Sequence, residues 1–211
     1  DEKNHVLKFL INQLENTKLL DKIIIATTTN EKDNIIEEFA KQNKLEFFRG
    51  EENDVLNRYF ETAKKFSLDA IVRITSDNPL VDPELIDKGI EIFNSKKLDV
   101  VTTNQTNTFP YGVVFEIFSF KALEEIEKKA SSSSDREHVT QFFYSNKQKF
   151  KIYNLTSKID ASYICCSIDT SNDLKFIREL IKKIQKRPIL LDDIISTITE
   201  SPKLLDINNK N

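Results

Sequence analysis

The strongest constraint in this sequence is the alternation of short apolar runs with longer stretches of helical periodicity. Four short runs have the length and composition of buried strands, at residues 22–27, 45–48, 70–74 and 99–103. Apolar residues recur at helical spacing over residues 7–14, 35–40, 56–63 and 83–93. This alternation predicts an α/β fold of three layers, with a mainly parallel central sheet that helices cover on both faces.

The second half of the chain is less regular. We expect strands at residues 113–118 and 150–155 and a last core strand at residues 162–168. Helices are expected at residues 120–129, 135–145, 174–184 and 192–198. The four serines at 131–134 predict a loop, and Asp135 is expected to cap the helix that follows. Earlier in the chain, Asp82 and either Asn53 or Asp54 are the expected caps.

Composition excludes several classes of protein. The 211 residues carry 31 Lys and Arg against 34 Asp and Glu, a balance that argues against a nucleic-acid binder. No apolar run approaches the roughly 20 residues of a membrane span. Only three glycines occur, and they are not clustered, so a glycine-rich phosphate loop is absent from this sequence. The adjacent Cys165 and Cys166 are expected to be reduced packing residues of a cytoplasmic protein.

Polar residues directly after predicted strands are candidates for a ligand site, because an open α/β sheet binds ligands beyond the carboxyl ends of its strands. Asp77 follows the strand at 70–74, and Asp169 follows the strand at 162–168. Two carboxylates at one edge would suit Mg²⁺, which completes its shell with water and substrate phosphates. The alternative is that each aspartate is a helix cap or turn residue, and spacing alone favours that alternative.

Arginines near predicted strand ends are further candidates. Arg49 and Gly50 follow the strand at 45–48, where Arg can bind phosphate or carboxylate and Gly lets the backbone approach a ligand. An ordinary turn explains this pair equally well. Arg58, in the following helix, lies opposite the apolar face and is expected to be solvated.

The segment that enters the helix at 135–145 concentrates ionisable side chains. Arg136 and His138 could contact an anion or a hydroxyl there, although a capping arrangement with an exposed His is slightly favoured by spacing. Gly112 followed by Glu116 is a weak signal by itself.

Taken in order, these segments resemble a known family. The chain is similar to the cytidylyltransferases related to spore-coat polysaccharide biosynthesis proteins, and more distantly to CMP-sialate and CMP-KDO synthetases. The resemblance covers nearly the whole chain. It is carried by KIIIATTT at 22–29, FRGEENDVLNRY at 48–59, IVRITSDNPLVDP at 71–83, PYG at 110–112 with Glu116, DREHVT at 135–140 and SIDT at 167–170.

The resemblance implies a Rossmann-like nucleotidyltransferase fold of the GT-A type, with residues 1–211 as one domain and residues 105–160 on its sugar side. It implies transfer of CMP from CTP to a sugar or sugar acid, with release of pyrophosphate, for cell-surface polysaccharide biosynthesis. Such relatives are often homodimers. By similarity, Asp77 and Asp169 would be the catalytic Mg²⁺ ligands. Substrate-binding residues would be Arg49 and Gly50 near the nucleotide, and Gly112, Glu116, Arg136 and His138 on the sugar side.

Two departures from the family pattern favour a different class of function. Relatives open with a strand and a loop rich in Gly, Arg and Lys that wraps the triphosphate, and Asp1 aligns just after that segment. Val114 stands where relatives tend to carry Asp. Both departures favour a non-catalytic binding or assembly protein on the same scaffold. The pair Asp77 and Asp169 and the motif at 135–140 favour the enzyme.

Overall fold

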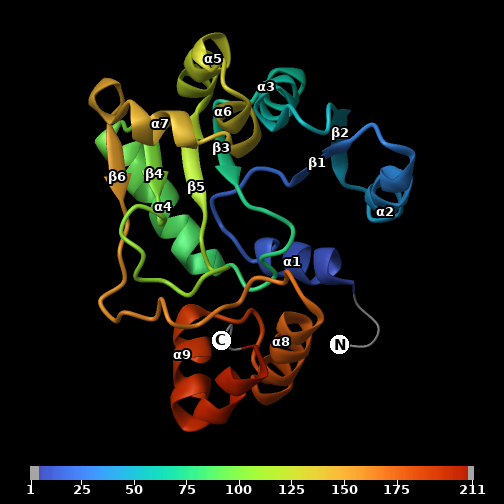
Figure 1. The fold of residues 1–211 in the computed structure, drawn as a ribbon, viewed down its shortest axis with the longest axis vertical. Coiled ribbons are helices and arrows are strands. Elements are labelled where there is room, and N and C mark those ends of the chain that lie inside the picture. The colour runs from blue at the N-terminus through green and yellow to red at the C-terminus, as the bar shows by residue number, and fades with distance from the viewer. Residues whose placement is uncertain (1–4, 209–211) are drawn as a thin grey trace.

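The computed structural model describes residues 5–208, and two β-sheets lie within that range (Figure 1). The smaller sheet pairs β1 with β2 in parallel, and the larger has the strand order β3-β5-β4-β6. Strands β3, β4 and β6 run in one direction, whereas β5 is antiparallel to both of its neighbours. The predicted parallel strands are therefore present, but the sequence did not predict the reversal of β5 or the division into two sheets. The strand bounds are β1 Ile24–Thr28, β2 Glu46–Gly50, β3 Ala70–Arg73, β4 Val100–Thr102, β5 Glu116–Ser119 and β6 Ile152–Asn154.

The reversal of β5 follows from the connection that leads into it. A parallel return needs a crossover of a dozen or more residues, usually a helix. Residues 103–115 contain no helix, so the chain turns back beside β4 and β5 begins only at Glu116, later than the predicted 113. Glu116 lies opposite Thr102 at the end of β4 and opposite Arg73 at the end of β3. The carboxyl ends of these two strands therefore meet at Glu116.

Nine α-helices accompany the sheets within residues 5–208. Expected caps are confirmed at two of them: Asp54 accepts a hydrogen bond from the Asn57 amide at 2.9 Å, and Asp82 accepts one from the Glu84 amide at 2.8 Å. No helix in this range is long and apolar enough to cross a bilayer. The helix bounds are α1 Val6–Leu14, α2 Asn34–Gln42, α3 Val55–Lys65, α4 Pro83–Lys96, α5 Phe120–Lys129, α6 Ser133–His138, α7 Gln141–Ser145, α8 Ser171–Lys183 and α9 Leu191–Glu200.

The larger sheet lies between two layers of helices (Figure 1). On one face, Ile71, Val100 and Phe118 pack against side chains of α3, α5 and α7. On the other face, Val101 and Ile117 pack against α4 and α1. Adjacent residues such as Val100 and Val101 face opposite layers because strand side chains alternate. This arrangement is the expected three-layer α/β fold.

The helix predicted over residues 135–145 is two short helices, α6 and α7. Val139 lies between them with a φ of +56°, a backbone conformation that is unfavourable for a β-branched residue. Its side chain is fully buried against the α3 and α5 layer, which offsets the strain. The expected cap was also wrong: the Ser132 hydroxyl accepts from the Asp135 amide at 3.1 Å, so Ser132 is the cap and helix α6 already includes two of the four serines.

Residues 162–168 were predicted as the last core strand, and this prediction was wrong. Residues 162–163 form a turn, and the rest of the segment makes one β-bridge, between Tyr111 and Cys165. Its apolar side chains are nevertheless buried, with Ile164 and Cys166 in a cluster formed with α8 and α9. Burial raises the pKa of the Cys166 thiol, in agreement with its predicted packing role. A run of apolar residues indicates that a segment is buried, but a segment can be buried without pairing in a β-sheet.

Helix α8 begins with a capping box directly after Asp169. The Thr170 hydroxyl accepts from the Asp173 amide at 3.3 Å, and the Asp173 carboxylate accepts from the Thr170 amide at 2.8 Å. Its second oxygen accepts from the Asn208 side chain at 3.2 Å. Burial acts to raise the pKa of Asp173, but the hydrogen bonds from Thr170 and Asn208 hold it below its usual value.

The stability of the fold should therefore depend on the ionisation of Asp173. Because its folded pKa lies below the unfolded value, its contribution is present at neutral pH and is lost as pH falls through the folded pKa. We expect Asp173→Asn to lower the free energy of unfolding by about 1 kcal/mol or more at about pH 7, and by less at about pH 3. Urea denaturation at both pH values measures this, with Asp192→Asn at an exposed position of α9 as the control. A difference that widens in acid would contradict the prediction.

Candidate active site

The structure brings Asp77 and the segment containing Asp169 together beyond the carboxyl end of β3. The Ile168 amide donates to the Asp77 carbonyl oxygen at 2.9 Å, and the Ser167 hydroxyl donates to the Asp77 carboxylate at 3.0 Å. Asp77 is half-buried, Asp169 is exposed and Ser167 is buried beneath them. The two predicted carboxylates thus lie on adjacent segments. Ser167, which sequence reasoning did not single out, orients one of them.

Gly112 makes the close approach that holds this segment in place. Its φ is +90°, and a Cβ atom there would lie 2.4 Å from the Ser167 nitrogen. On either side of this contact, the Tyr111 amide donates to the Ile164 carbonyl at 2.9 Å, and the Cys166 amide donates to the Tyr111 carbonyl at 2.6 Å. Gly112 is therefore required by backbone packing against the residues that lead to Asp169.

The residues at this edge offer oxygen atoms of the kind that bind Mg²⁺. Asp77 and Asp169 offer carboxylates, and the side-chain oxygen of Asn78 is buried without a hydrogen-bond partner in residues 5–208. In the same range no three His, Cys, Asp or Glu side chains gather as a metal cluster. Mg²⁺ needs only one or two carboxylates, because water and phosphate oxygens complete its octahedron. The assignment of Asp77 and Asp169 as its ligands stays a prediction.

Glu116 lies at the same edge in a closed hydrogen-bond network. Its side chain is 2% exposed, and one carboxylate oxygen accepts from Arg73 at 2.8 Å and from the Thr140 hydroxyl at 3.0 Å. The Tyr144 hydroxyl makes a short hydrogen bond to the other oxygen. These donors satisfy a buried charge and tie β5 to β3 and α7. The predicted contact of Glu116 with a sugar therefore requires this network to open.

The hydroxyl protons of the network have one consistent arrangement. The Asn104 amide donates to the Thr102 hydroxyl oxygen at 3.0 Å, and that oxygen lies 3.0 Å from the Tyr144 hydroxyl. Since Tyr144 has one hydroxyl proton and gives it to Glu116, Thr102 must donate to Tyr144. Burial, followed by the charge of Glu116, raises the pKa of Tyr144 strongly, so the phenol remains a donor at neutral pH.

The Arg49 guanidinium, which was predicted to contact a ligand, is hydrogen-bonded to other groups of the protein. Its Nε donates to the Thr28 carbonyl at 2.7 Å, and its Nη2 donates to the Asn30 carbonyl at 2.7 Å. Its Nη1 donates to Asn34 at 2.8 Å and to the Glu37 carboxylate at 2.7 Å. These bonds fasten the end of β2 to the end of β1 and to α2. They leave little of the guanidinium for a substrate, and the predicted contact with the nucleotide stays untested.

Arg136 and His138 occupy different environments although both belong to α6. Arg136 forms a bidentate pair with Asp54 at 2.9 and 2.7 Å and donates to the Glu127 carbonyl at 3.1 Å, which braces α6 against α3 and α5. Hydrogen bonding to Asp54 raises the pKa of Arg136 further. His138, at the end of the helix, is exposed. Of this predicted pair, His138 is the side chain open to a ligand.

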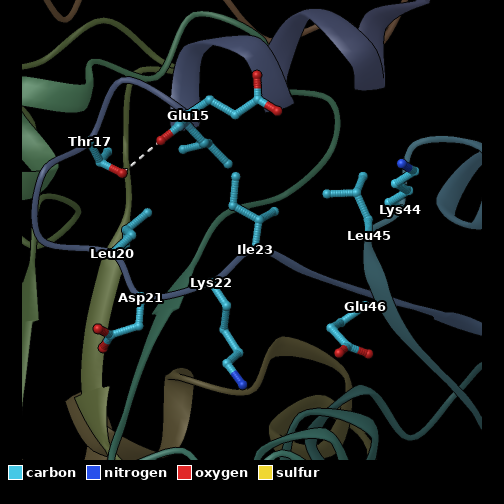
Figure 2. Close-up of a pocket in the computed structure, with 10 residues that line it drawn as sticks. Glu15, Thr17, Leu20, Asp21, Lys22, Ile23, Lys44, Leu45 and Glu46 are labelled. Atoms are coloured by element: carbon cyan, nitrogen blue, oxygen red, sulfur yellow. Dashed lines mark hydrogen bonds between the residues drawn. The ribbon is translucent and has the colours of Figure 1, made fainter.

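A cavity of about 310 Å³ opens at the amino ends of β1 and β2 (Figure 2). Leu14 and Glu15 from the end of α1, residues 20–23 and residues 44–46 line it. Arg49 and Gly50 lie at the opposite ends of these strands, and no predicted site residue lines the cavity. The candidate site is therefore the surface at the carboxyl ends, where Asp77, Gly112 and the segment 165–169 meet.

Comparisons with known proteins agree on one family. The profile of the cytidylyltransferase family matches residues 4–198. The chain is 37% identical over 206 residues to the uncharacterized protein MJ1063 of Methanocaldococcus jannaschii, an alignment that covers 97% of this chain and 84% of that protein. It is 28% identical over 207 residues to the spore coat polysaccharide biosynthesis protein SpsF of Bacillus subtilis, with 94% and 85% covered.

A solved cytidylyltransferase from Leptospira borgpetersenii matches the fold with a TM-score of 0.93, at 29% identity over 99% of this chain and 88% of that one. The chain belongs to the cytidylyltransferase family.

Sequence reasoning missed four residues that organise this edge: Arg73, Thr140, Tyr144 and Ser167. Arg73 carried a usable signal, because a charged residue that ends a buried apolar strand needs a partner. Thr140 lay at the end of the DREHVT motif but was not singled out, and Tyr144 carried no signal because it lay within a predicted helix. Val114, the departure noted above, packs against the apolar cluster under α4 and adds no polar group to the edge.

Gly112→Ala should damage both the stability of the protein and the geometry of this edge. We expect it to lower the free energy of unfolding by about 2 kcal/mol or more, because a Cβ atom would collide with the Ser167 backbone at a positive φ. Gly50→Ala is the matched control, since a Cβ atom there would lie 3.1 Å from the Phe48 ring without the left-handed backbone. Chemical denaturation compares the two variants, and equal stabilities would contradict the prediction.

Proposed function

We propose that this protein transfers CMP from CTP to a hydroxyl or phosphate of a sugar or sugar acid, with release of pyrophosphate, in the synthesis of cell-surface polysaccharide. Membership of the cytidylyltransferase family supports the transfer chemistry. The similarity to a spore coat polysaccharide biosynthesis protein supports the acceptor class and the pathway. The observation that carries the proposal is the juxtaposition of Asp77 with the segment of Asp169 at the carboxyl end of β3.

The proposed reaction is a displacement at the α-phosphorus of CTP. The acceptor oxygen forms a bond to this phosphorus, the bond to the bridging β-phosphate oxygen breaks, and pyrophosphate leaves with the electron pair. A hydroxyl acceptor releases its proton to solvent. When bound by Asp77 and Asp169, Mg²⁺ would neutralise charge on the phosphates.

The chain's own residues have positioning roles in this proposal. Ser167 fixes the direction of the Asp77 carboxylate through a hydrogen bond of 3.0 Å. Glu116, through Arg73 and Tyr144, holds the ends of β3 and β4 against α7. His138 is exposed at the end of α6 and is the residue we expect to meet the acceptor. A homodimer and a cytoplasmic location are part of the proposal and follow from the resemblance and the adjacent cysteines.

The test is an assay of CTP-dependent pyrophosphate release by the full-length protein with Mg²⁺ and a panel of sugar acids and sugar phosphates. We expect Asp77→Ala and Asp169→Ala each to reduce turnover by about a hundredfold or more, because each removes charge that holds the metal against the phosphates. Circular dichroism checks that both variants fold. Asp192→Ala, which removes an exposed carboxylate from α9, should leave turnover unchanged.

Two results would overturn the proposal in different ways. Retained turnover in both variants would remove Asp77 and Asp169 from the metal site. Binding of CTP by the wild type without pyrophosphate release on any acceptor would favour the non-catalytic binding protein, the alternative that Val114 supports.

A further inference from the structure

Few aromatic side chains of this protein are exposed, and one of them lies beside the candidate site. The sequence has 15 Phe and 5 Tyr, all of them within the described residues 5–208. Only Tyr111, at 52%, and Tyr163, at 60%, are exposed. A single exposed ring needs no explanation on its own. Its assignment to a ligand therefore depends on how firmly the residue is held and on where its side chain points.

The backbone of Tyr111 is held in place by hydrogen bonds on both sides. Its amide donates to the Ile164 carbonyl at 2.9 Å, and its carbonyl accepts from the Cys166 amide at 2.6 Å. The residues next to it in the sequence, Pro110 and Gly112, are buried. The ring therefore projects from a fixed backbone, so a ligand that covers it does not first have to order the loop.

The side chain of Tyr111 lies on the same face as the Ser167 hydroxyl. Tyr111 pairs with Cys165 in a parallel β-bridge, and paired residues place their side chains on one face of the pair. Side chains alternate along the segment that follows. Cys166 is buried in the cluster with α8 and α9, whereas the Ser167 hydroxyl donates to the Asp77 carboxylate at 3.0 Å. The exposed ring of Tyr111 therefore stands on the side of this segment that meets Asp77.

The surroundings of Tyr111 favour a sugar ring over a nucleotide base as its ligand. A base is recognised through hydrogen bonds to its edge as well as through stacking. The residues on either side of Tyr111 bring no polar side chain for such bonds: Phe109, Pro110, Gly112 and Val113. A pyranose ring presents C–H bonds on its face and hydroxyls around its rim, which match the apolar face and the polar tip of a tyrosine.

We propose that the Tyr111 ring packs against the pyranose ring of the acceptor and so helps to select the acceptor that binds beside Asp77. The class of acceptor rests on the proposed function. An acceptor that places its reactive oxygen at the Asp77 edge extends its ring along the face on which Tyr111 stands. The contact is apolar and distant from the reacting phosphorus, so it contributes to binding of the acceptor rather than to the chemical step.

The test titrates D-glucuronate and, separately, D-glucose 1-phosphate into the full-length protein with Mg²⁺ and measures each dissociation constant by saturation-transfer difference NMR. CMP, which has the base but no pyranose ring, is titrated in the same way. Tyr111→Ala removes the ring, and Tyr111→Phe keeps its apolar face. Tyr163→Ala is the matched control, because it removes the other exposed tyrosine from a turn that lies farther from Ser167 along the segment. Thermal unfolding checks that all three variants fold.

We expect Tyr111→Ala to weaken binding of at least one of the two pyranose compounds by about fivefold or more. Tyr111→Phe and Tyr163→Ala should each change it by less than about twofold, and CMP binding should be unchanged in all three variants. The proposal is overturned if the wild type binds neither pyranose compound, if Tyr111→Ala binds both as the wild type does, or if the control loses as much.

Two further results would place the ring elsewhere and also overturn the proposal. Weaker CMP binding by Tyr111→Ala would assign the ring to the base. A change in the molar mass of this variant, measured by light scattering, would assign the ring to an interface between copies of the chain. Pyranose binding that depends on Tyr111, without turnover on any acceptor, would refute the proposed function alone, whereas turnover with pyranose binding unchanged in Tyr111→Ala would refute this inference alone.

Discussion

The buried carboxylate of Glu116 is the interaction on which the ligand edge of this molecule depends. It lies opposite both Arg73 and Thr102, so it joins the ends of β3 and β4 through a strand that runs the other way. Its hydrogen bonds to Thr140 and Tyr144 add α7 to the same edge. A buried charge is tolerated only when it is paired, and removal of one partner leaves the other uncompensated. The order of the three strands and the position of α7 are therefore coupled through one side chain.

Two arginines near this edge brace the scaffold. Arg49 and Arg136 donate to carbonyls and carboxylates that fix α2 and α6. Their positive charges are paired with Glu37 and Asp54, respectively. Within residues 5–208, Arg58 donates to the Glu51 carbonyl and forms no ion pair, whereas Arg73 pairs with Glu116. Spacing made Arg49 and Arg136 candidate ligand contacts, because sequence shows where an arginine lies along the chain but not which acceptors surround it.

The sequence predicted elements that depend on local patterns and failed where tertiary contacts decide. The first four strands, the helix α5 and the caps at Asp54 and Asp82 were predicted because periodicity and capping chemistry are local. The break at Val139 was not, because only burial of that side chain makes its positive φ acceptable. Residues 162–168 have the composition of a strand, yet they begin with a turn and pair with another segment only through one β-bridge, from Cys165 to Tyr111. The meeting of Ser167 with Asp77, 90 positions apart in the sequence, follows from the close approach of Gly112 to the Ser167 backbone.

The carboxylates of Asp77 and Asp169 are thus positioned by loops. Backbone contacts in turn hold these loops in place. Asp77 is held through its carbonyl by Ile168 and through its carboxylate by Ser167, and the backbone of Ser167 packs against Gly112. Residues 103–115, which contain Gly112, also form the link that reverses β5 and places Glu116 beside Arg73. This connection, which contains no helix, therefore sets the positions of Asp77 and Asp169 and of the hydrogen-bond network around Glu116 at the same time. A change in the length of that connection would alter both together.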